Sequence, residues 1–431
     1  MKFAFITPRY GAEITHGAEH VCRLLAERVC ERHDVDVLTT CVRDSNTWKN
    51  EYAEGIDRIR GVVVRRFAAA GGRDADAFRA FTQRLYTNAH SRADELEWVR
   101  RTGSTSPPLV DFLRRQHRQY DALVFFSYWA GTTVHGMAVA PERSVLFPCA
   151  RLEPAMRWIV TQDTLGAPAA VAYCSSAERR LVRAHMLRHP RAEEIVGVGV
   201  EPVPEARYPR MEQDVDPPES RIPDVDETEV EARPAPAHLA GRGILFRRRQ
   251  RLDDRFVLYG GSVEPENGTE EMIEYFASYA EQNGQTPLVL MGVKMMKLPQ
   301  APWLRMAGVL ADRERMFALE AADVAIAPDP DDLAAVQVLE SFAMGTPVLA
   351  SARNSAAVDH CRRARAGLYY ANRDEFVEAL RLMMTNDALR SALGQNGRRY
   401  VQQHYLWEAV IGRFERVVAR ARGEKPAAAG R

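Results

Sequence analysis

The sequence predicts an α/β protein with two doubly wound domains, because short apolar runs alternate with amphipathic helical patterns in each half of the chain. Strand-like runs in the first half occupy residues 3–6, 35–38, 62–64, 123–126, 145–147, 171–173 and 195–198. In the second half they occupy residues 256–260, 288–291, 306–310, 324–328, 348–350 and 368–370. Between the halves, residues 202–236 are rich in proline and acidic side chains and poor in large apolar ones, so they are expected to separate the domains.

Length and composition fit large buried cores and exclude some partners. The chain has 431 residues, of which 46% are hydrophobic. Lys plus Arg and Asp plus Glu both number 58, so no overall charge favours nucleic acid, and we expect no nucleic-acid partner. The six cysteines form no Cys-x-x-Cys pair, which favours free thiols in a reducing compartment and argues against a metal site.

The amino terminus, MKFAFITPRYG, has an apolar run of only a few residues that leads directly into a loop. This pattern indicates a first strand instead of a signal peptide. No segment approaches the roughly 18 apolar residues of a spanning helix. We therefore expect a cytoplasmic protein.

One helix start is expected near residue 175. Ser175 followed three residues later by Glu178 matches a capping box, in which the two side chains bond each other's backbone N–H groups. The box would begin the helix that carries Leu181 and Val182.

The most informative segment is VAIAPDPDDLAAVQVLESFAMGTPVLAS, residues 324–351. Its apolar run at 324–328 predicts a buried strand, and residues 335–344 have helical apolar spacing that stops at Gly345. Asp332 and Glu340 lie on either side of the expected helix start. Both carboxylates can therefore line the crevice at the carboxyl ends of the strands, where open α/β sheets bind ligands.

This segment resembles the donor-binding motif of glycosyltransferase family 4, which has a Glu, seven residues, a second Glu and then a small-Gly-Thr-Pro-Val turn. Asp332 departs from the first Glu and is one methylene shorter. The resemblance continues in KFAFITPRYGAEITHGAEHVCRLLAERV near the start and in FVLYGGSVEPENGTEEMIEYF later on. The stretches TWKNEY (residues 47–52) and ELEW (residues 95–98) are similar to those of one subgroup. The family implies a GT-B fold, in which two Rossmann-like domains face each other across a cleft.

On this basis we expect an acceptor-side domain over residues 1–202, a Pro- and acid-rich linker or insertion over 203–250, and a nucleotide-sugar donor domain over 251–403. Residues 404–422 would form a helix that, as in GT-B proteins, packs back on the first domain. Residues 423–431 would form a tail.

The resemblance also implies roles for the two carboxylates. Glu340 falls on the Glu that binds ribose, and Asp332 falls on the position that holds the donor sugar. Ionised carboxylates suit these tasks because their hydrogen bonds to hydroxyl groups are charge-assisted. The family's Gly-Phe-Gly is replaced here by Leu333, Ala334 and Ala335. The plainer alternative is an acidic loop followed by a solvated helical Glu.

The cations of the family site are replaced. Where relatives carry an Arg and a Lys for the departing diphosphate, this chain has Ser262 and Asn267. Lys294 could compensate, or be a solvated surface residue. Gly17 precedes a helix whose N–H groups could bind phosphate, although a tight turn explains it equally well. Arg151 stands where relatives have a His; it could clamp an anion or pair with a nearby Glu.

Together these residues define the expected site and function. The expected catalytic residues are Asp332, Arg151 and Lys294. The expected donor-binding residues are Glu340, Gly17, Ser262, Asn267, Leu333 and Ala334. The function implied is retaining transfer of a hexose from a nucleotide-diphosphate sugar, such as a UDP- or GDP-hexose, to a saccharide or lipid-linked acceptor.

Envelope or exopolysaccharide assembly is the expected setting, without a cofactor or metal. A peripheral contact with the inner face of the membrane or with a partner transferase is compatible with this hypothesis. The alternative is a catalytically impaired GT-B homologue that acts as a binding or partner subunit, because several substitutions fall in one cleft.

Overall fold

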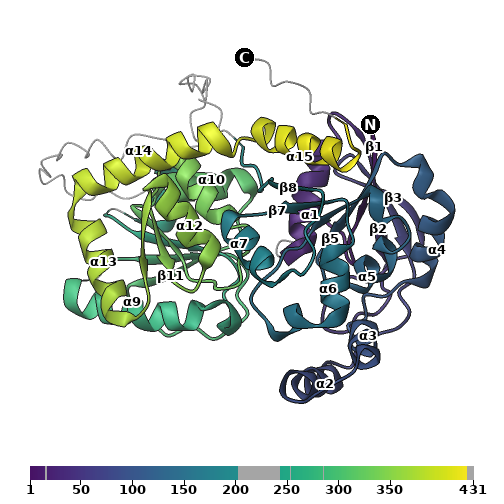
Figure 1. The fold of residues 1–431 in the computed structure, drawn as a ribbon. Helices are drawn as coiled ribbons and strands as arrows, with labels where there is room; N and C mark the ends of the chain where they lie inside the picture. The colour runs from purple at the N-terminus through teal and green to yellow at the C-terminus, as the bar shows by residue number, and fades with distance from the viewer. Residues whose placement is uncertain (15–16, 202–242, 253, 285, 425–431) are drawn as a thin grey trace, which may run out of the picture.

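The computed structural model describes residues 1–14, 17–201, 243–252, 254–284 and 286–424. Two α/β domains lie side by side, each built on one sheet with helices packed against it (Figure 1). The predicted fold class, α/β with two doubly wound domains, is confirmed. Among the described residues, no helix combines the length and the apolar character that a membrane crossing requires.

The first sheet has eight strands in the order β3-β4-β2-β1-β5-β6-β7-β8. All neighbours pair in parallel except β3, which is antiparallel to β4. Its strands are β1 (Lys2–Ile6), β2 (Asp34–Thr40), β3 (Gly55–Ile59), β4 (Val62–Phe67), β5 (Ala122–Phe126), β6 (Ser144–Phe147), β7 (Ala170–Tyr173) and β8 (Ala192–Ile195). The strand order reverses between β1 and β5, so their following loops flank a crevice at the carboxyl edge.

The helices of the first domain connect these parallel strands. They are α1 (Gly17–Val29), α2 (Ala75–Thr87), α3 (Arg92–Arg101), α4 (Pro107–Gln116), α5 (Gly131–Met137), α6 (Ile159–Gly166) and α7 (Ser176–His185). Short 3-10 turns are η1 (His117–Gln119), η2 (Pro141–Arg143) and η3 (Pro154–Arg157). Helices α2 and α3 project from the body of the domain (Figure 1).

The second sheet has six parallel strands in the order β11-β10-β9-β12-β13-β14, with the reversal between β9 and β12. Its strands are β9 (Val257–Gly260), β10 (Leu288–Met291), β11 (Leu304–Gly308), β12 (Val324–Ala327), β13 (Val348–Ser351) and β14 (Gly367–Tyr370). The helices are α8 (Ile244–Gln250), α9 (Thr269–Asn283), α10 (Asp312–Ala321), α11 (Val336–Met344), α12 (Ser355–Ala364), α13 (Arg373–Thr385), α14 (Asp387–His404) and α15 (Trp407–Ala421), and η5 (Pro265–Asn267) precedes α9.

Nearly every strand was predicted from the sequence, but two predicted ranges are displaced along the chain from the observed strands. The run at 195–198 lies beyond β8, which ends at Ile195, and β11 begins at Leu304, before the predicted 306–310. Strand β3 was not predicted, because its sequence GIDRI contains no apolar run and its residues are almost all exposed. It is held by its antiparallel ladder with β4.

The expected linker, residues 203–250, includes a helix of the second domain. Residues 203–242 lie outside the described residues, and residues 244–250 form α8 on the second domain. Phe246 is buried there, and the Arg247 guanidinium donates a hydrogen bond to the backbone carbonyl of Ala321 at 2.6 Å. These contacts attach α8 to the end of α10.

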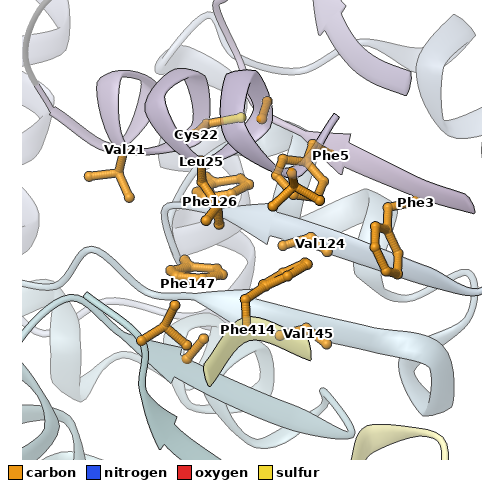
Figure 2. Close-up of a cluster of buried hydrophobic side chains, with 14 of the residues drawn as sticks. Phe3, Phe5, Val21, Cys22, Leu25, Val124, Phe126, Val145, Phe147 and Phe414 are labelled. Atoms are coloured by element: carbon orange, nitrogen blue, oxygen red, sulfur yellow. The ribbon is translucent and has the colours of Figure 1, made fainter. Parts of the chain in front are cut away.

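Helix α15 lies against β6, β7 and β8 of the first sheet, after α14 has run along the second domain (Figure 1). Its apolar stripe enters the buried cluster of the first domain. The Phe414 ring makes edge contacts with Phe3 at 5.4 Å and Phe5 at 5.7 Å between centroids (Figure 2). The chain therefore crosses between the domains a second time.

The predicted capping box at α7 forms only on one side. Ser175 Oγ accepts from the Glu178 N–H at 3.1 Å, as expected. The Glu178 carboxylate instead accepts from the backbone N–H groups of Cys174 and Ala150. Glu178 thus links the end of β7 to the loop after β6. All six cysteines are free.

Candidate active site

The candidate site lies at the strand-order reversal of the second sheet. The loop after β9 carries Ser262 and Asn267, and the loop after β12 carries Asp332. Because β9 and β12 are neighbours and parallel, both loops leave the same edge of the sheet. This edge is where doubly wound sheets bind ligands.

Asp332 lies just before α11 and supports its start. Its Oδ1 accepts a hydrogen bond from the Ala335 N–H at 2.9 Å, and Ala335 adopts a left-handed conformation with φ of 45°. Burial raises the pKa of the Asp332 carboxyl. The Asp332 carboxylate therefore holds the backbone at the start of α11 through the N–H groups of Ala335 and Ala334.

Glu340 is in the middle of α11 and is only 7% exposed. The Arg315 guanidinium, on α10, forms an ion pair with its carboxylate. Burial raises the pKa of Glu340, and Arg315 opposes that shift. The alternative of a solvated helical Glu is wrong, because this carboxylate is buried and paired.

The acidic loop reaches across to the first domain. Arg151, in the loop after β6, forms an ion pair with Asp331 at 3.0 Å, and both side chains are 53% exposed. The sequence had suggested a neighbouring Glu as its partner. An exposed pair of this kind is worth about 0–1 kcal/mol, so a ligand anion can replace Asp331.

Asp329 begins the same loop and has an altered pKa. Burial raises its pKa to about 6, and the charges of Asp332, Asp331 and Glu264 contribute in the same direction. Several carboxylates therefore share this corner of the cleft.

Ser262 and Asn267 have different environments. The Asn267 amide is buried and faces inward: its Nδ2 donates to the Tyr259 hydroxyl at 3.1 Å and to the Ser262 carbonyl, while its Oδ1 accepts from Thr269. Asn267 therefore holds the loop before α9. Within the described chain the Ser262 hydroxyl forms no hydrogen bond, whereas the Ser262 carbonyl also accepts from the Tyr259 hydroxyl.

Lys294 lies beside this loop. Its neighbours Val293 and Met295 hydrogen bond with Val263 through the backbone, at 2.8 and 2.9 Å. Within the described residues Lys294 forms no ion pair, and it is exposed. The structure thus brings the Lys294 backbone next to Ser262.

Exposed apolar side chains accompany these polar groups. Val293 follows β10 and is 51% exposed, and Val309 follows β11 and is 72% exposed. Both lie beyond the carboxyl ends of strands in the same parallel sheet as β9 and β12. They offer apolar surface to a flat ring such as a nucleobase.

Leu333 and Ala334 are located at the domain contact. Ala334 belongs to the buried cluster of the first domain, and Leu333 and Val336 pack against it. A second contact is made by Asp359 of α12, which pairs with Arg180 of α7 at 3.0 Å and accepts from Ser176. The loop that carries Asp332 is therefore fixed against the first domain.

Gly17 begins α1 with φ of 74°, a left-handed conformation that favours glycine. Nearby, Arg9 follows β1, is 7% exposed, and donates to Glu19 of α1 at 3.1 Å and to the Arg43 carbonyl. The left-handed backbone at Gly17 explains why a glycine stands there. The Arg9 guanidinium lies close to the start of α1.

Sequence reasoning missed Arg315, Arg9 and the second role of Glu178. Arg315 looks like a surface residue of α10, and only the packing of α10 on α11 brings it to Glu340. Arg9 could have been found from the sequence, because it follows the first predicted strand, and residues at the carboxyl ends of parallel strands often bind ligands. Glu178 matched a local motif that obscured its contacts with residues distant in sequence.

Glu178 gives a prediction about pH. Burial raises its pKa from 4.5 to about 7, so between these pH values the folded chain binds more protons than the unfolded chain. The free energy of unfolding should therefore fall as pH rises from 4.5 to about 7, by roughly 1–3 kcal/mol, and this contribution should be constant above that. Glu178→Gln should remove this contribution and leave a smaller slope, to which Asp329 with its raised pKa contributes. Urea unfolding at pH 5, 6, 7 and 8 measures it.

The matched control is Glu142→Gln, an exposed residue in η2. It should retain the pH dependence of the parent. Identical slopes for the parent and Glu178→Gln would contradict the assignment of this titration to Glu178.

Comparison with known proteins supports the fold of this chain. Residues 244–400 match the family model described as glycosyl transferases group 1. The sucrose-phosphate synthase of Thermosynechococcus elongatus is similar over 96% of this chain and 98% of its own, with 17% identity and a TM-score of 0.62. HepE of Anabaena, solved with UDP and glucose, is similar over 97% and 99%, with 12% identity and a TM-score of 0.64.

The trehalose-6-phosphate synthase OtsA is also similar, over 99% of this chain and 100% of its own, with 12% identity and a TM-score of 0.66. The chain therefore has the GT-B fold, and its second domain matches the group 1 glycosyltransferase model. The match begins at α8, which agrees with its packing on the second domain.

Proposed function

We propose that this protein is a glycosyltransferase that moves a hexose from a nucleotide-diphosphate sugar to a saccharide or lipid-linked acceptor, with retention. The observation that carries the proposal is the pair of carboxylates, Asp332 and buried Glu340, at the strand-order reversal of the second sheet. Glu340 would accept hydrogen bonds from ribose hydroxyls, and Asp332 from hydroxyls of the donor sugar. Val293 and Val309 would face the base.

Similar structures support the class of donor. HepE has been solved with UDP-glucose as well as with UDP and glucose. In the proposed reaction, the bond between the sugar and the diphosphate breaks, its electrons leave with the nucleoside diphosphate, and an acceptor oxygen forms the new bond to the same face of the sugar. The acceptor proton passes to the departing phosphate oxygen.

The departing diphosphate requires positive charge. Arg151, Lys294 and Arg315 could supply this charge. Arg151 is exposed and held by a weak ion pair, so it can leave Asp331 for the phosphate. Charge placed where charge develops in the transition state lowers the barrier.

A binding or partner subunit is the second candidate. It is favoured by the ion pairs that occupy Arg151 and Arg315, and by the absence of a cation at positions 262 and 267. Such a protein would bind the nucleotide sugar without turnover.

Both candidates can be tested with a panel of nucleotide sugars and the purified protein. Thermal stabilisation reports binding, and release of nucleoside diphosphate reports turnover. We expect one donor both to stabilise the chain and to be consumed when an acceptor is present. Stabilisation without release would assign the protein to the binding class, and the absence of both would exclude a nucleotide-sugar function.

Arg151 provides a prediction about turnover. Arg151→Gln should lower the rate of nucleoside-diphosphate release on the order of a hundredfold, because it removes a charge from the leaving group. Asp331→Asn breaks the same ion pair but leaves Arg151 free, so its rate should equal or exceed that of the parent. Equal losses in both variants would show that the ion pair matters only for the structure.

A further inference from the structure

A cavity of about 260 Å³ lies in the first domain, between the loop after β4 and helices α2 and α3. Its wall includes the Gly71–Gly72 turn, the start of α2, and three arginines: Arg73, Arg100 and Arg101. Pockets for drug-sized ligands are larger, at roughly 300–1,000 Å³, so this cavity fits a single ring or one charged group.

Arg73 is a half-buried cation that forms no ion pair among the described residues, although the charge of Asp44 acts on it. Its Nη2 donates to the Ser45 carbonyl, but its Nε is buried and has no hydrogen-bond partner in that part of the chain. The guanidinium stacks on Phe78 at 5.1 Å and lies 5.9 Å from the Trp48 ring. A desolvated donor of this kind is costly unless an acceptor reaches it.

Arg100 and Arg101 share one counterion. Arg100 donates to both oxygens of Glu97 at 2.6 Å, and Arg101 donates to one of them at 2.7 Å. The Asp74 side chain caps α2 through the Ala77 N–H. Among the described residues the three arginines thus form ion pairs with one carboxylate, Glu97, and the start of α2 adds positive potential.

Two sequence motifs support the arginines of this cavity. In TWKNEY, the Thr47 carbonyl accepts from the Arg73 N–H at 2.7 Å, and the Trp48 ring supports the Arg73 guanidinium. In ELEW, Glu97 orients Arg100 and Arg101. Neither motif lines the cavity itself, and the proposed donor site uses neither of them.

A second unpartnered polar atom lies in the same wall. The Thr105 hydroxyl is buried and has no hydrogen-bond partner in the described chain. A hydroxyl can donate to an anion, as can the free Nε of Arg73. Both atoms are shielded from solvent, and the Thr105 oxygen faces Gly131 of α5, so the groups that the wall presents to an anion are the Arg73, Arg100 and Arg101 guanidinium groups.

We propose that this cavity binds an anionic group, phosphate or carboxylate, of the sugar acceptor. This inference rests on the proposed function. Arginine suits both anions because its planar fork binds two oxygens at once. The cavity follows β4, which is separated from β1 by β2 in the first sheet.

The test is a calorimetric titration of the full-length protein at constant ionic strength. The probes are inorganic phosphate, glucose 6-phosphate and glucuronate, with glucose as the neutral comparison. We expect at least one anion to bind at least tenfold more tightly than glucose. Preference for the sugar phosphate or for the uronate then identifies the source of the charge.

Variants locate the binding. Arg73→Lys retains the charge but loses the fork, and Arg100→Gln changes an exposed side chain that is 64% accessible, so folding should be retained. Both should weaken anion binding at least fivefold. Arg79→Gln is the control, because Arg79 is exposed on α2 and does not line the cavity.

Equal anion affinities in the parent, Arg73→Lys and Arg100→Gln would overturn the proposal, as would the absence of anion binding in the parent. A parallel titration with UDP and GDP separates this proposal from the proposed function. If nucleotides bind and anions do not, the acceptor subsite is wrong and the donor site stands. If anions bind and nucleotides do not, the cavity binds anions but not as part of a sugar acceptor.

Discussion

Glu340→Ala is expected to abolish the stabilisation of the folded chain by nucleoside diphosphates. Charge-assisted hydrogen bonds contribute about 1.5–3 kcal/mol, so losing those to ribose should weaken binding roughly ten- to a hundredfold. A ligand that binds only the folded state raises its stability by about 2.7 kcal/mol at a hundred times its dissociation constant, and the variant should lose about 1.3–2.3 kcal/mol of this. The measurement is thermal unfolding with and without UDP or GDP.

The controls separate ribose binding from damage to the fold. Glu314→Gln removes a carboxylate from the same helix as Arg315, where Glu314 pairs only with Arg249 of α8 at 2.6 Å among described partners, and should keep the full nucleotide effect. Glu340→Gln preserves the size of the side chain and should lose the effect nearly as Ala does. Equal nucleotide stabilisation of Glu340→Ala and the parent would remove Glu340 from the site.

Phe414→Ala should lower the free energy of unfolding by about 3–5 kcal/mol. The ring is fully buried between α15 and the first sheet, and truncating such a ring leaves a cavity that packing cannot refill (Figure 2). The loss should appear in the first domain, where Phe3 and Phe5 contact the ring. Urea unfolding followed by circular dichroism measures it.

Arg416→Ala is the comparison on the same helix. Arg416 is 40% exposed, and its ion pair with Glu194 at 4.0 Å should contribute little. A loss below 1 kcal/mol for Phe414→Ala would show that α15 does not share the stability of the first domain.

The strands could be predicted because buried parallel strands are short, apolar and bounded by turns. Val324 to Ala327 shows this pattern, and its boundaries were almost correct. Strand β3 could not be found in this way, since its exposed sequence carries no apolar signal. The expected linker failed at α8 because three consecutive arginines there, Arg247 to Arg249, look solvated, while Arg247 is in fact buried against Ala321.

The positions of the two carboxylates could be predicted from the sequence, but the ion pairs around them could not. Asp332 and Glu340 are positioned by a local strand-loop-helix pattern. Their surroundings depend on contacts between elements: Arg315 reaches Glu340 from α10, and Arg151 reaches Asp331 from the other domain. The inward-facing amide of Asn267 is similarly determined by Tyr259 and Thr269, so its role in donor binding stays a prediction that the packing does not favour.

The central claim is that a nucleotide occupies the strand-order reversal of the second domain, and a crystal structure of the chain with UDP or GDP tests it most directly. The account predicts ribose hydroxyls within hydrogen-bond distance of the Glu340 carboxylate, a base beside Val293 and Val309, and a diphosphate that faces Ser262 and Arg151. A nucleotide bound elsewhere, with the Glu340–Arg315 ion pair intact and no ligand at Asp332, would contradict it.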